Sequence, residues 1–186
     1  ATSTCRRLRQ QPHAERVSCD SMPLASGCSL RGTDADWSRL TSKQLTVAIS
    51  SLGRSKEWQE ALGLLRRVRG SKDASAEINI FSYGAAIATC ERSVQWSLAL
   101  QLLHDLIDDS LEPNVIVWSS AASACDKAER WLEAIALLRQ MPGRRLQPNA
   151  VTYGATISAC ARVAEWQQAF LLLWEAEAEG TVMNIV

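Results

Sequence analysis

Residues 114–149, NVIVWSSAASACDKAERWLEAIALLRQMPGRRLQPN, contain the pattern that decides the fold. The asparagine that opens this stretch returns at its end, 35 residues later. Cysteine and tryptophan recur at the same interval beyond it. A fixed period of this length in three residue types indicates stacked supersecondary units, because a single globular core imposes no such register. The three series are Asn79, Asn114, Asn149 and Asn184; Cys90, Cys125 and Cys160; and Trp96, Trp131 and Trp166.

The period extends towards the N-terminus with one irregularity. Trp58 precedes Trp96 by 38 residues, so the first unit carries three extra residues, which we place in the loop 70–76. Surface loops tolerate such insertions at small entropic cost. We therefore predict an array over residues 41–183, with units at 41–78, 79–113, 114–148 and 149–183. Residues 184–186 begin an incomplete unit.

Within each unit the apolar residues follow helical spacing twice. In the second unit Ile80, Tyr83, Ile87 and Cys90 form one face, and a second face begins at Trp96. Proline lacks an amide donor and disfavours helix in the residue before it, so Pro113 and Pro148 end their units. A lone pair of helices cannot bury both faces, and stacking supplies the core. The predicted fold class is all-α.

Composition restricts the function. Apolar residues make up 47% of the 186 residues, which predicts a packed core. Residues 79–186 contain seven basic and twelve acidic residues, a net charge of −5. This charge argues against a broadly basic nucleic-acid-binding surface, so any RNA contact requires positive charge confined to one stripe. No apolar run approaches the roughly 20 residues that span a bilayer, so we expect no membrane partner.

Nothing in the sequence indicates catalysis. There is no nucleophile–base constellation, no glycine-rich phosphate loop and no cluster of metal-binding carboxylates, so we predict no enzyme, no cofactor and no small-molecule substrate. The six cysteines include no CxxC pair and are accompanied by only two histidines, which argues against zinc. We interpret the recurring cysteines as small apolar residues in helix packing.

Residues 1–40 form a separate leader. The first 36 lack periodicity, and we expect them to be disordered. Their arginines (Arg6, Arg7, Arg9 and Arg16) are typical of an organelle transit peptide, whereas Glu15 and Asp20 are not. A flexible leader, or a cut from a longer chain, is the alternative.

Several segments resemble the pentatricopeptide repeat family, with P-type units of 35 residues. They are 114–119 (NVIVWS), 124–134 (ACDKAERWLEA), 146–149 (LQPN), 151–154 (VTYG), 157–160 (ISAC) and 166–169 (WQQA). The resemblance covers about 145 of the 186 residues. The tetratricopeptide repeat has a different period and a W-x2-L-G-x2-Y signature, which is absent.

The resemblance implies a right-handed α-solenoid whose first helices line a groove. It implies sequence-selective binding of single-stranded RNA, about one base per repeat. It further implies work in a mitochondrion or chloroplast, on RNA processing, stability, editing or translation. An acidic C-terminal half and two glycines at base-reading positions leave an alternative open: a protein-binding scaffold, or a degenerate array without RNA affinity. In either case we expect a segment of a longer protein.

The resemblance also assigns candidate site residues. The family reads a base with the residue after the first-helix aromatic and the residue after the closing proline. An asparagine amide offers both a donor and an acceptor to a base edge. Asparagine also caps helices well, so each could serve the following helix instead. The implied pairs are Thr46 with Asn79, Gly84 with Asn114, Ser119 with Asn149, and Gly154 with Asn184.

Two further sets follow. Each unit carries a cation near the end of its first helix, where the family contacts the RNA backbone; the alternative is a favourable charge at a helix C-terminus. Three apolar residues match the sites that sandwich each base in the family, and in the first unit Lys43 stands at this site. The alternative role of the apolar residues is packing between adjacent repeats. The four recurring tryptophans we place in the core. The cations are Arg54, Arg92, Lys127 and Arg162; the stacking residues are Phe81, Ile116 and Val151; the tryptophans are Trp58, Trp96, Trp131 and Trp166.

Overall fold

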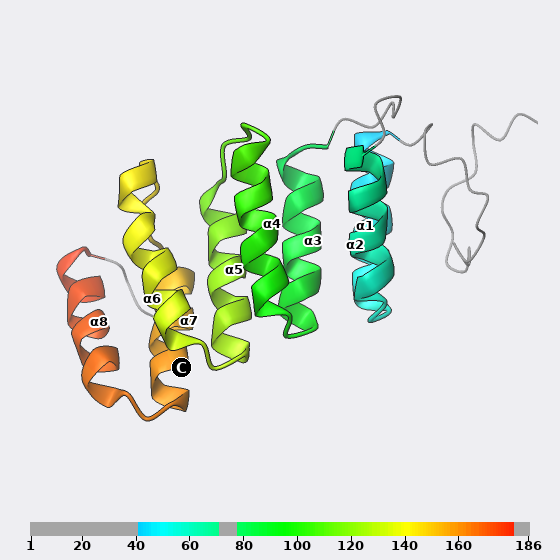
Figure 1. The fold of residues 1–186 in the computed structure, drawn as a ribbon. Coiled ribbons are helices and arrows are strands. Elements are labelled where there is room, and N and C mark those ends of the chain that lie inside the picture. The colour runs from blue at the N-terminus through cyan, green and yellow to red at the C-terminus, as the bar shows by residue number, and fades with distance from the viewer. Residues whose placement is uncertain (1–40, 71–77, 181–186) are drawn as a thin grey trace, which may run out of the picture. The chain divides into compact units, whose positions relative to one another are not determined.

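A computed structural model describes residues 41–70 and 78–180, which form four helical hairpins. Figure 1 shows the helices side by side, and no strand occurs in the described ranges. This confirms the prediction of an all-α solenoid of stacked hairpins. The helices are α1 (Ser42–Arg54), α2 (Trp58–Gly70), α3 (Ile80–Arg92), α4 (Trp96–Asp108), α5 (Val115–Lys127), α6 (Trp131–Gln140), α7 (Ala150–Arg162) and α8 (Trp166–Ala178), with a 3-10 turn η3 (Pro142–Arg144) after α6.

The same turn joins the two helices of every hairpin. In the second hairpin the amide of Gln95 donates to the carbonyl of Cys90 at 2.9 Å, and Val94 between them has a φ of 57°. This is the Schellman cap, which needs one left-handed residue and usually takes glycine. The three other hairpins repeat the bond and the positive φ without glycine. Their left-handed residues are Lys56, Glu129 and Ala164, and their carbonyl acceptors are Leu52, Cys125 and Cys160.

The first helices form one closely packed layer. Contacts join α1 to α3, α3 to α5, and α5 to α7, and also join each first helix to its own second helix. Small buried residues make this approach possible, as Ala121 and Ala124 do in α5. The approach is tight at Gly53, where an added Cβ would lie 2.2 Å from the Thr89 hydroxyl oxygen. First-helix spacing is therefore set by small side chains.

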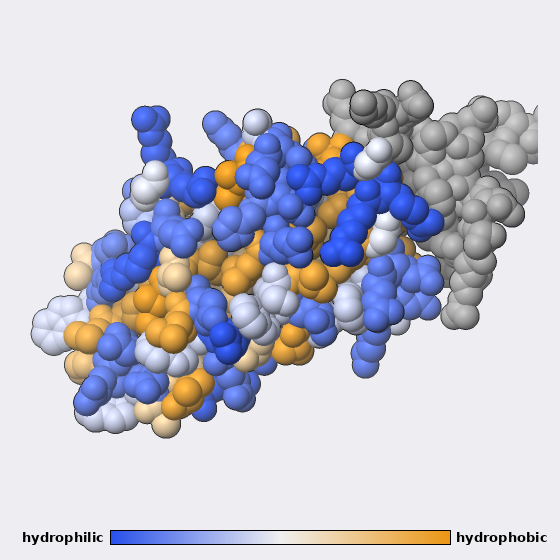
Figure 2. Space-filling model, viewed as in Figure 1, coloured by the Kyte–Doolittle hydropathy of each residue, from blue (hydrophilic) through white to orange (hydrophobic). Residues whose placement is uncertain are grey.

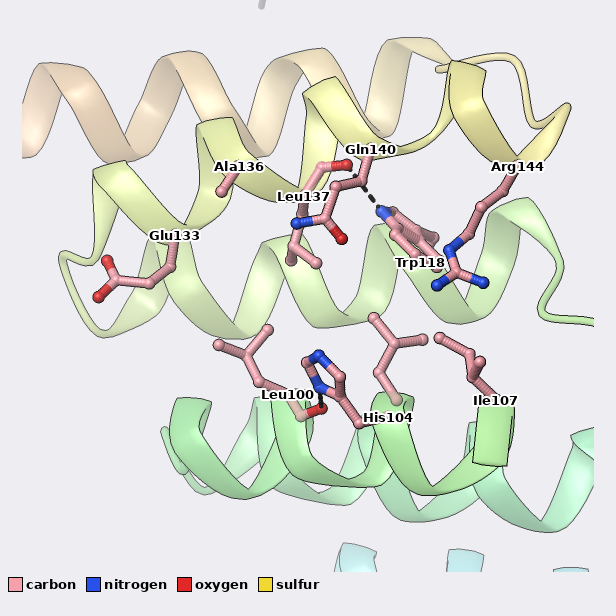
Figure 3. A pocket seen from close by; sticks show the side chains of 10 residues that line it. Leu100, His104, Ile107, Trp118, Glu133, Ala136, Leu137, Gln140 and Arg144 are labelled. Atoms are coloured by element: carbon pink, nitrogen blue, oxygen red, sulfur yellow. Dashed lines mark hydrogen bonds between the residues drawn. The ribbon is translucent and has the colours of Figure 1, made fainter. Parts of the chain in front are cut away.

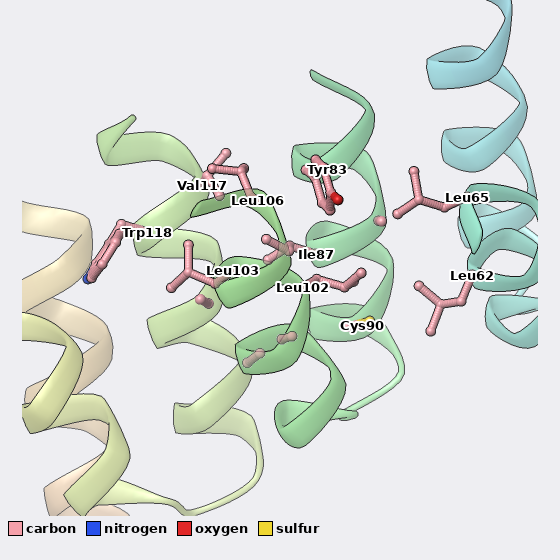
Figure 4. Close-up of a cluster of buried hydrophobic side chains, with 14 of the residues drawn as sticks. Leu62, Leu65, Tyr83, Ile87, Cys90, Leu102, Leu103, Leu106, Val117 and Trp118 are labelled. Atoms are coloured by element: carbon pink, nitrogen blue, oxygen red, sulfur yellow. The ribbon is translucent and has the colours of Figure 1, made fainter. Parts of the chain in front are cut away.

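Leucines of the second helices fill the space behind this layer. Figure 4 shows Leu62 and Leu65 of α2 facing Tyr83 and Ile87 of α3, with side chains of α4 on the other side. One buried cluster thus runs from the first hairpin into α7, and a second, smaller cluster joins α6, α7 and α8. No described helix is both long enough and apolar enough to cross a bilayer.

The tryptophans that open the second helices lie at the edge of this core. Trp58, Trp96 and Trp131 are half-buried against it, and Arg130 of the next hairpin lies 4.5 Å above the Trp96 ring. The core prediction is wrong for Trp166, whose side chain is 70% exposed. The reason is that no further hairpin follows α8 in the described residues.

The outer face of α8 is apolar and exposed, since no described hairpin packs against it. Phe170 is 61% exposed and Trp174 is 69% exposed, while Leu173 is half-buried. Figure 2 shows hydrophobic surface in the region of α8 and α6. The inner face of α8 is anchored by Leu172 and Ala176, which are buried.

The cysteines at the ends of the first helices are buried and free, as expected for apolar residues in helix packing. Burial raises the pKa of Cys90 to about 11 and that of Cys125 to about 12, and it also raises the pKa of Cys160. These thiols stay neutral in the folded protein at pH values that ionise them in the unfolded chain.

We predict that Gly53→Ala lowers the free energy of unfolding by about 1–2 kcal/mol, because the methyl group overpacks the contact between α1 and α3. Gly63→Ala in α2 is the matched control. Its Cβ meets nothing within 4 Å, so the gain in helix propensity should stabilise by up to about 1 kcal/mol. Urea denaturation measures both, and equal effects would contradict the close approach at Gly53.

A second prediction concerns alkaline pH. Unfolded thiols ionise near pH 8.5, and folded Cys125 does so only near its raised pKa of about 12. The unfolded state then binds fewer protons, so stability falls as pH rises between these values. Compared with wild type, Cys125→Ala should lose less stability from pH 9 to pH 10, by up to about 1.4 kcal/mol. Denaturation at pH 7.5 gives the baseline free energy of unfolding for each protein. An equal fall of this free energy with pH in wild type and in Cys125→Ala would refute the raised pKa of Cys125.

Candidate nucleic-acid interface

Asparagines cap three of the first helices. The Oδ1 atoms of Asn79, Asn114 and Asn149 accept the backbone N–H of the third helical residue at 3.0, 2.9 and 2.9 Å. The cap uses the side-chain oxygen, and the three asparagines are half-buried. Each amide nitrogen makes no hydrogen bond to the described residues. The capping role is therefore present and leaves a donor for a base. Asn184 lies outside the described residues.

The partner positions are the fifth residues of the first helices. Thr46 is half-buried, and its hydroxyl donates to the Ser42 carbonyl and lies 3.2 Å from Ser82 Oγ, which itself donates to Asn79 Oδ1. The structure thus brings Thr46 and Asn79 together through Ser82. Gly84 lies against Val117, whose amide Asn114 caps, since an added Cβ would be 3.4 Å from a Val117 methyl group.

The other two fifth residues differ from each other. Ser119 is only 7% exposed, and its hydroxyl donates to the Ile116 carbonyl at 2.9 Å, so only its acceptor capacity is left for a ligand. Gly154 is half-buried, and a Cβ there would meet nothing within 4 Å.

The second residues of three first helices are large, apolar and exposed. Phe81 is 68% exposed, Ile116 is 71% and Val151 is 58%. Packing between repeats, the alternative for these positions, would bury them. Lys43 occupies the equivalent place in α1 and is exposed too. Because α1, α3, α5 and α7 pack side by side, these residues recur along the same layer as the asparagines.

Four cations end the first helices. Arg54, Arg92, Lys127 and Arg162 are each the last residue of their helix and are exposed. Lys127 Nζ lies 2.9 Å from Glu91, and Arg162 Nε lies 3.1 Å from Asp126. The row of cations lies about 12 Å along the helix from the row of fifth residues.

Sequence reasoning missed the two carboxylates in this row. Glu91 and Asp126 each precede a cation of their own helix and bind the cation of the next, at a separation of 36 residues. In α1 the residue that corresponds to Glu91 and Asp126 is Gly53. Arg92 therefore lies beside a glycine and not beside an acid, and it donates to the Thr89 hydroxyl at 3.3 Å. Neither Arg54 nor Arg92 forms an ion pair with a described residue. The sequence pattern that could have indicated these ion pairs is an acid directly before the cation in two successive units.

A second feature that sequence reasoning missed joins the second helices. Arg69 of α2 binds Asp105 at 3.0 Å and Asp109 at 2.8 Å, and the hydroxyl of Tyr83 also bonds Asp109. We call this set, Arg69, Tyr83, Asp105 and Asp109, the first clamp. Hydrogen bonds to Asp105 and Asp109 raise the pKa of Arg69. Burial, and then the bond to Asp109, raise the pKa of Tyr83.

The clamp recurs two units later, 70 residues along the chain. Arg139 binds Glu175, and the Glu179 carboxylate acts on Tyr153; we call Arg139, Tyr153, Glu175 and Glu179 the second clamp. Burial, and then the Glu179 carboxylate, raise the pKa of Tyr153. Both clamps connect neighbouring second helices.

The described residues hold no group of three or more His, Cys, Asp or Glu side chains that could bind a metal ion. They also contain no buried side-chain polar atom without a hydrogen bond. The polar groups with capacity for a ligand are therefore at the surface.

The comparisons with known proteins agree with this architecture. The family model described as PPR repeat matches residues 45–72, which include most of the first hairpin. No curated protein matches the chain. The match supports the sequence resemblance to pentatricopeptide repeats in the first hairpin, and the other three described hairpins repeat its fold.

Three solved structures illustrate the similarity. The pentatricopeptide repeat protein PPR10 in complex with an 18-nt psaJ RNA element has a TM-score of 0.70 at 22% identity, over 78% of this chain and 21% of that chain. PPR10 from maize has a TM-score of 0.63 at 26% identity, over 77% and 20%. The PPR domain of Arabidopsis thaliana protein-only RNase P 1 in complex with tRNA has a TM-score of 0.65 at 16% identity, over 76% and 74%. The chain spans about a fifth of PPR10.

We predict that Asn149→Ala lowers the free energy of unfolding by about 1 kcal/mol, because the amide of Thr152 loses its acceptor. Asn149→Asp keeps an oxygen in place and should leave stability nearly unchanged. Thermal denaturation followed by circular dichroism compares the variants. Equal losses would mean that Asn149 does not stabilise α7 as a cap.

Proposed function

We propose that the first-helix layer binds single-stranded RNA, with about one base per repeat. The observation that carries this proposal is the row of Phe81, Ile116 and Val151, which are exposed at equivalent places of three successive helices. Exposed apolar side chains in register fit contact with the faces of bases. For an aromatic ring such as that of Phe81, stacking on a base contributes about 1–3 kcal/mol in other proteins. The asparagine amides lie in the same helix-end layer.

The cation row fits the RNA backbone. Ion pairs between exposed side chains contribute little, about 0–1 kcal/mol, so a phosphate can displace Glu91 from Lys127 and Asp126 from Arg162 at small cost. Arg54 and Arg92 have no such competitor among the described residues. These contacts would position the strand and would not read its sequence.

The similar structures support RNA as the ligand class. Two of them are complexes, one with a psaJ RNA element and the other with tRNA. We extend this to sequence-selective binding by the present chain, in RNA processing, stability, editing or translation inside a mitochondrion or chloroplast. The described hairpins would bind RNA and leave any chemistry to other parts of a larger protein.

Charge reversal tests the phosphate contacts. Arg92→Glu should weaken binding of a fluorescein-labelled A-rich RNA octamer by about tenfold, and Lys127→Glu should weaken it less, since Glu91 already compensates Lys127. With four phosphates bound, log K should fall with log salt at a slope of about −2.8, and Arg92→Glu should reduce this slope by about 0.7. Fluorescence anisotropy at 50–200 mM NaCl measures both quantities.

Arg66→Glu is the matched control, with the same charge change on the second-helix layer at α2. An equal loss in Arg66→Glu would indicate non-specific attraction. A salt-independent affinity, or none, would favour a protein-binding scaffold or an array without RNA affinity. Asn149→Asp tests base reading separately: one carboxylate oxygen keeps the cap, and the other replaces the amide donor by an acceptor for the N1–H and N2–H donors of guanine, so preference at one position should move from adenine towards guanine.

A further inference from the structure

The interface between the second and third hairpins lacks the clamp that its two neighbours have. In the 35-residue register, the first-clamp residues Arg69, Tyr83, Asp105 and Asp109 correspond to His104, Trp118, Gln140 and Arg144. Both carboxylates are gone, and an arginine stands where Asp109 and Glu179 stand in the flanking interfaces. The central interface therefore carries a cation without an acid to bind it.

A pocket of about 110 Å³ occupies the place of the missing clamp. Figure 3 shows it between α4 and α6, with the Trp118 ring at its inner side and Arg144 beside that ring. Leu100 and Leu103 of α4 and Leu137 of α6 supply apolar walls. The Trp118 indole N–H is already used, donating to the Leu137 carbonyl at 2.9 Å.

The cation beside the pocket is available for a ligand. The Arg144 guanidinium carbon lies 5.6 Å from the centre of the Trp118 ring, and Arg144 is exposed and forms no ion pair with a described residue. Figure 3 places Glu133 at the other end of the pocket. Arg130 binds Glu133 at 2.6 Å, and although burial opposes it, this bond lowers the pKa of Glu133. Its charge is thus compensated locally.

We propose that this pocket is a docking site for an acidic segment of a partner protein, with one glutamate side chain inserted between α4 and α6 and paired with Arg144. The glutamate would supply the carboxylate that the flanking interfaces supply from within the chain. Its methylene groups would contact the apolar walls.

The dimensions favour one side chain over a free ligand. Pockets for cofactors and drug-sized molecules measure about 300–1,000 Å³, several times this volume. A charged pair that is partly shielded by Trp118 and the leucines would be stronger than one on open surface. The site lies on the second helices, so RNA on the first-helix layer would leave it accessible. The proposal does not depend on RNA binding.

Nuclear magnetic resonance of the full 186-residue chain tests the proposal, because the indole N–H of Trp118 is a local reporter among seven tryptophans. The probe is the acetylated and amidated peptide Glu-Leu-Glu-Leu-Glu, and the control peptide has glutamine for glutamate. We expect a saturable shift of the Trp118 signal with the first peptide only. No shift, or the same shift with glutamine, would overturn the proposal.

Two arginine variants separate the site from general charge. Arg144→Glu should weaken peptide binding at least tenfold, while Arg145→Glu, the next residue and not part of the pocket, should change it less than twofold. Equal losses would refute a specific site. RNA affinity should be the same in both variants, so a failure of RNA binding and a failure of this proposal are distinguishable.

A third variant guards against simple misfolding. His104→Arg, Gln140→Asp and Arg144→Asp together introduce clamp residues and keep Trp118 as the reporter. We expect this variant to remain folded by circular dichroism and to lose peptide binding at least tenfold. Retained binding would overturn the proposal. So would a Trp118 signal that responds to the RNA octamer instead of the peptide, or to self-association of the chain seen by sedimentation.

Discussion

Close packing between successive first helices is the constraint on which the rest of this structure depends. Side chains as small as Ala121 and Ala124 allow the helices to approach, and at Gly53 the approach leaves no room for a methyl group. Dense contact of this kind fixes the relative position of neighbours, because interiors pack without space to slide. Every residue at an equivalent place of α1, α3, α5 and α7 is thereby brought into a common row.

The rows differ in what the packing leaves exposed. The side-chain oxygen of Asn149 caps α7 while its amide hydrogens stay unbonded to the described residues, so the same residue can stabilise the helix and still offer a donor to a ligand. Val151, two positions later, is apolar and yet 58% exposed. At the other end of the helices, exposed ion pairs such as that of Lys127 with Glu91 hold the cations in place weakly enough for exchange with phosphate.

The second helices are connected by long polar side chains, whereas the first helices pack through small ones. Arg69 and Arg139 each reach an acid of the next second helix, and a buried tyrosine completes each clamp. The central interface replaces this arrangement with Trp118 and Arg144, and a pocket results. A repeat protein can thus keep one layer uniform for a periodic ligand while the other layer varies locally, because each hairpin contacts only its neighbours.

The period of 35 residues, the helical spacing of apolar residues and the unit-ending prolines determine the hairpins, because secondary structure and stacking follow from local pattern. The same pattern placed the asparagines and cations at equivalent positions. It could not show that Glu91 and Asp126 bind cations of the next helix, because that pairing depends on the stagger between neighbours. Nor could it show that Ser119 is almost buried while Ile116, three residues earlier, is exposed. Trp166 repeats Trp131 in the sequence and yet lies in solvent, because burial depends on what packs against a residue and only the tertiary structure decides that.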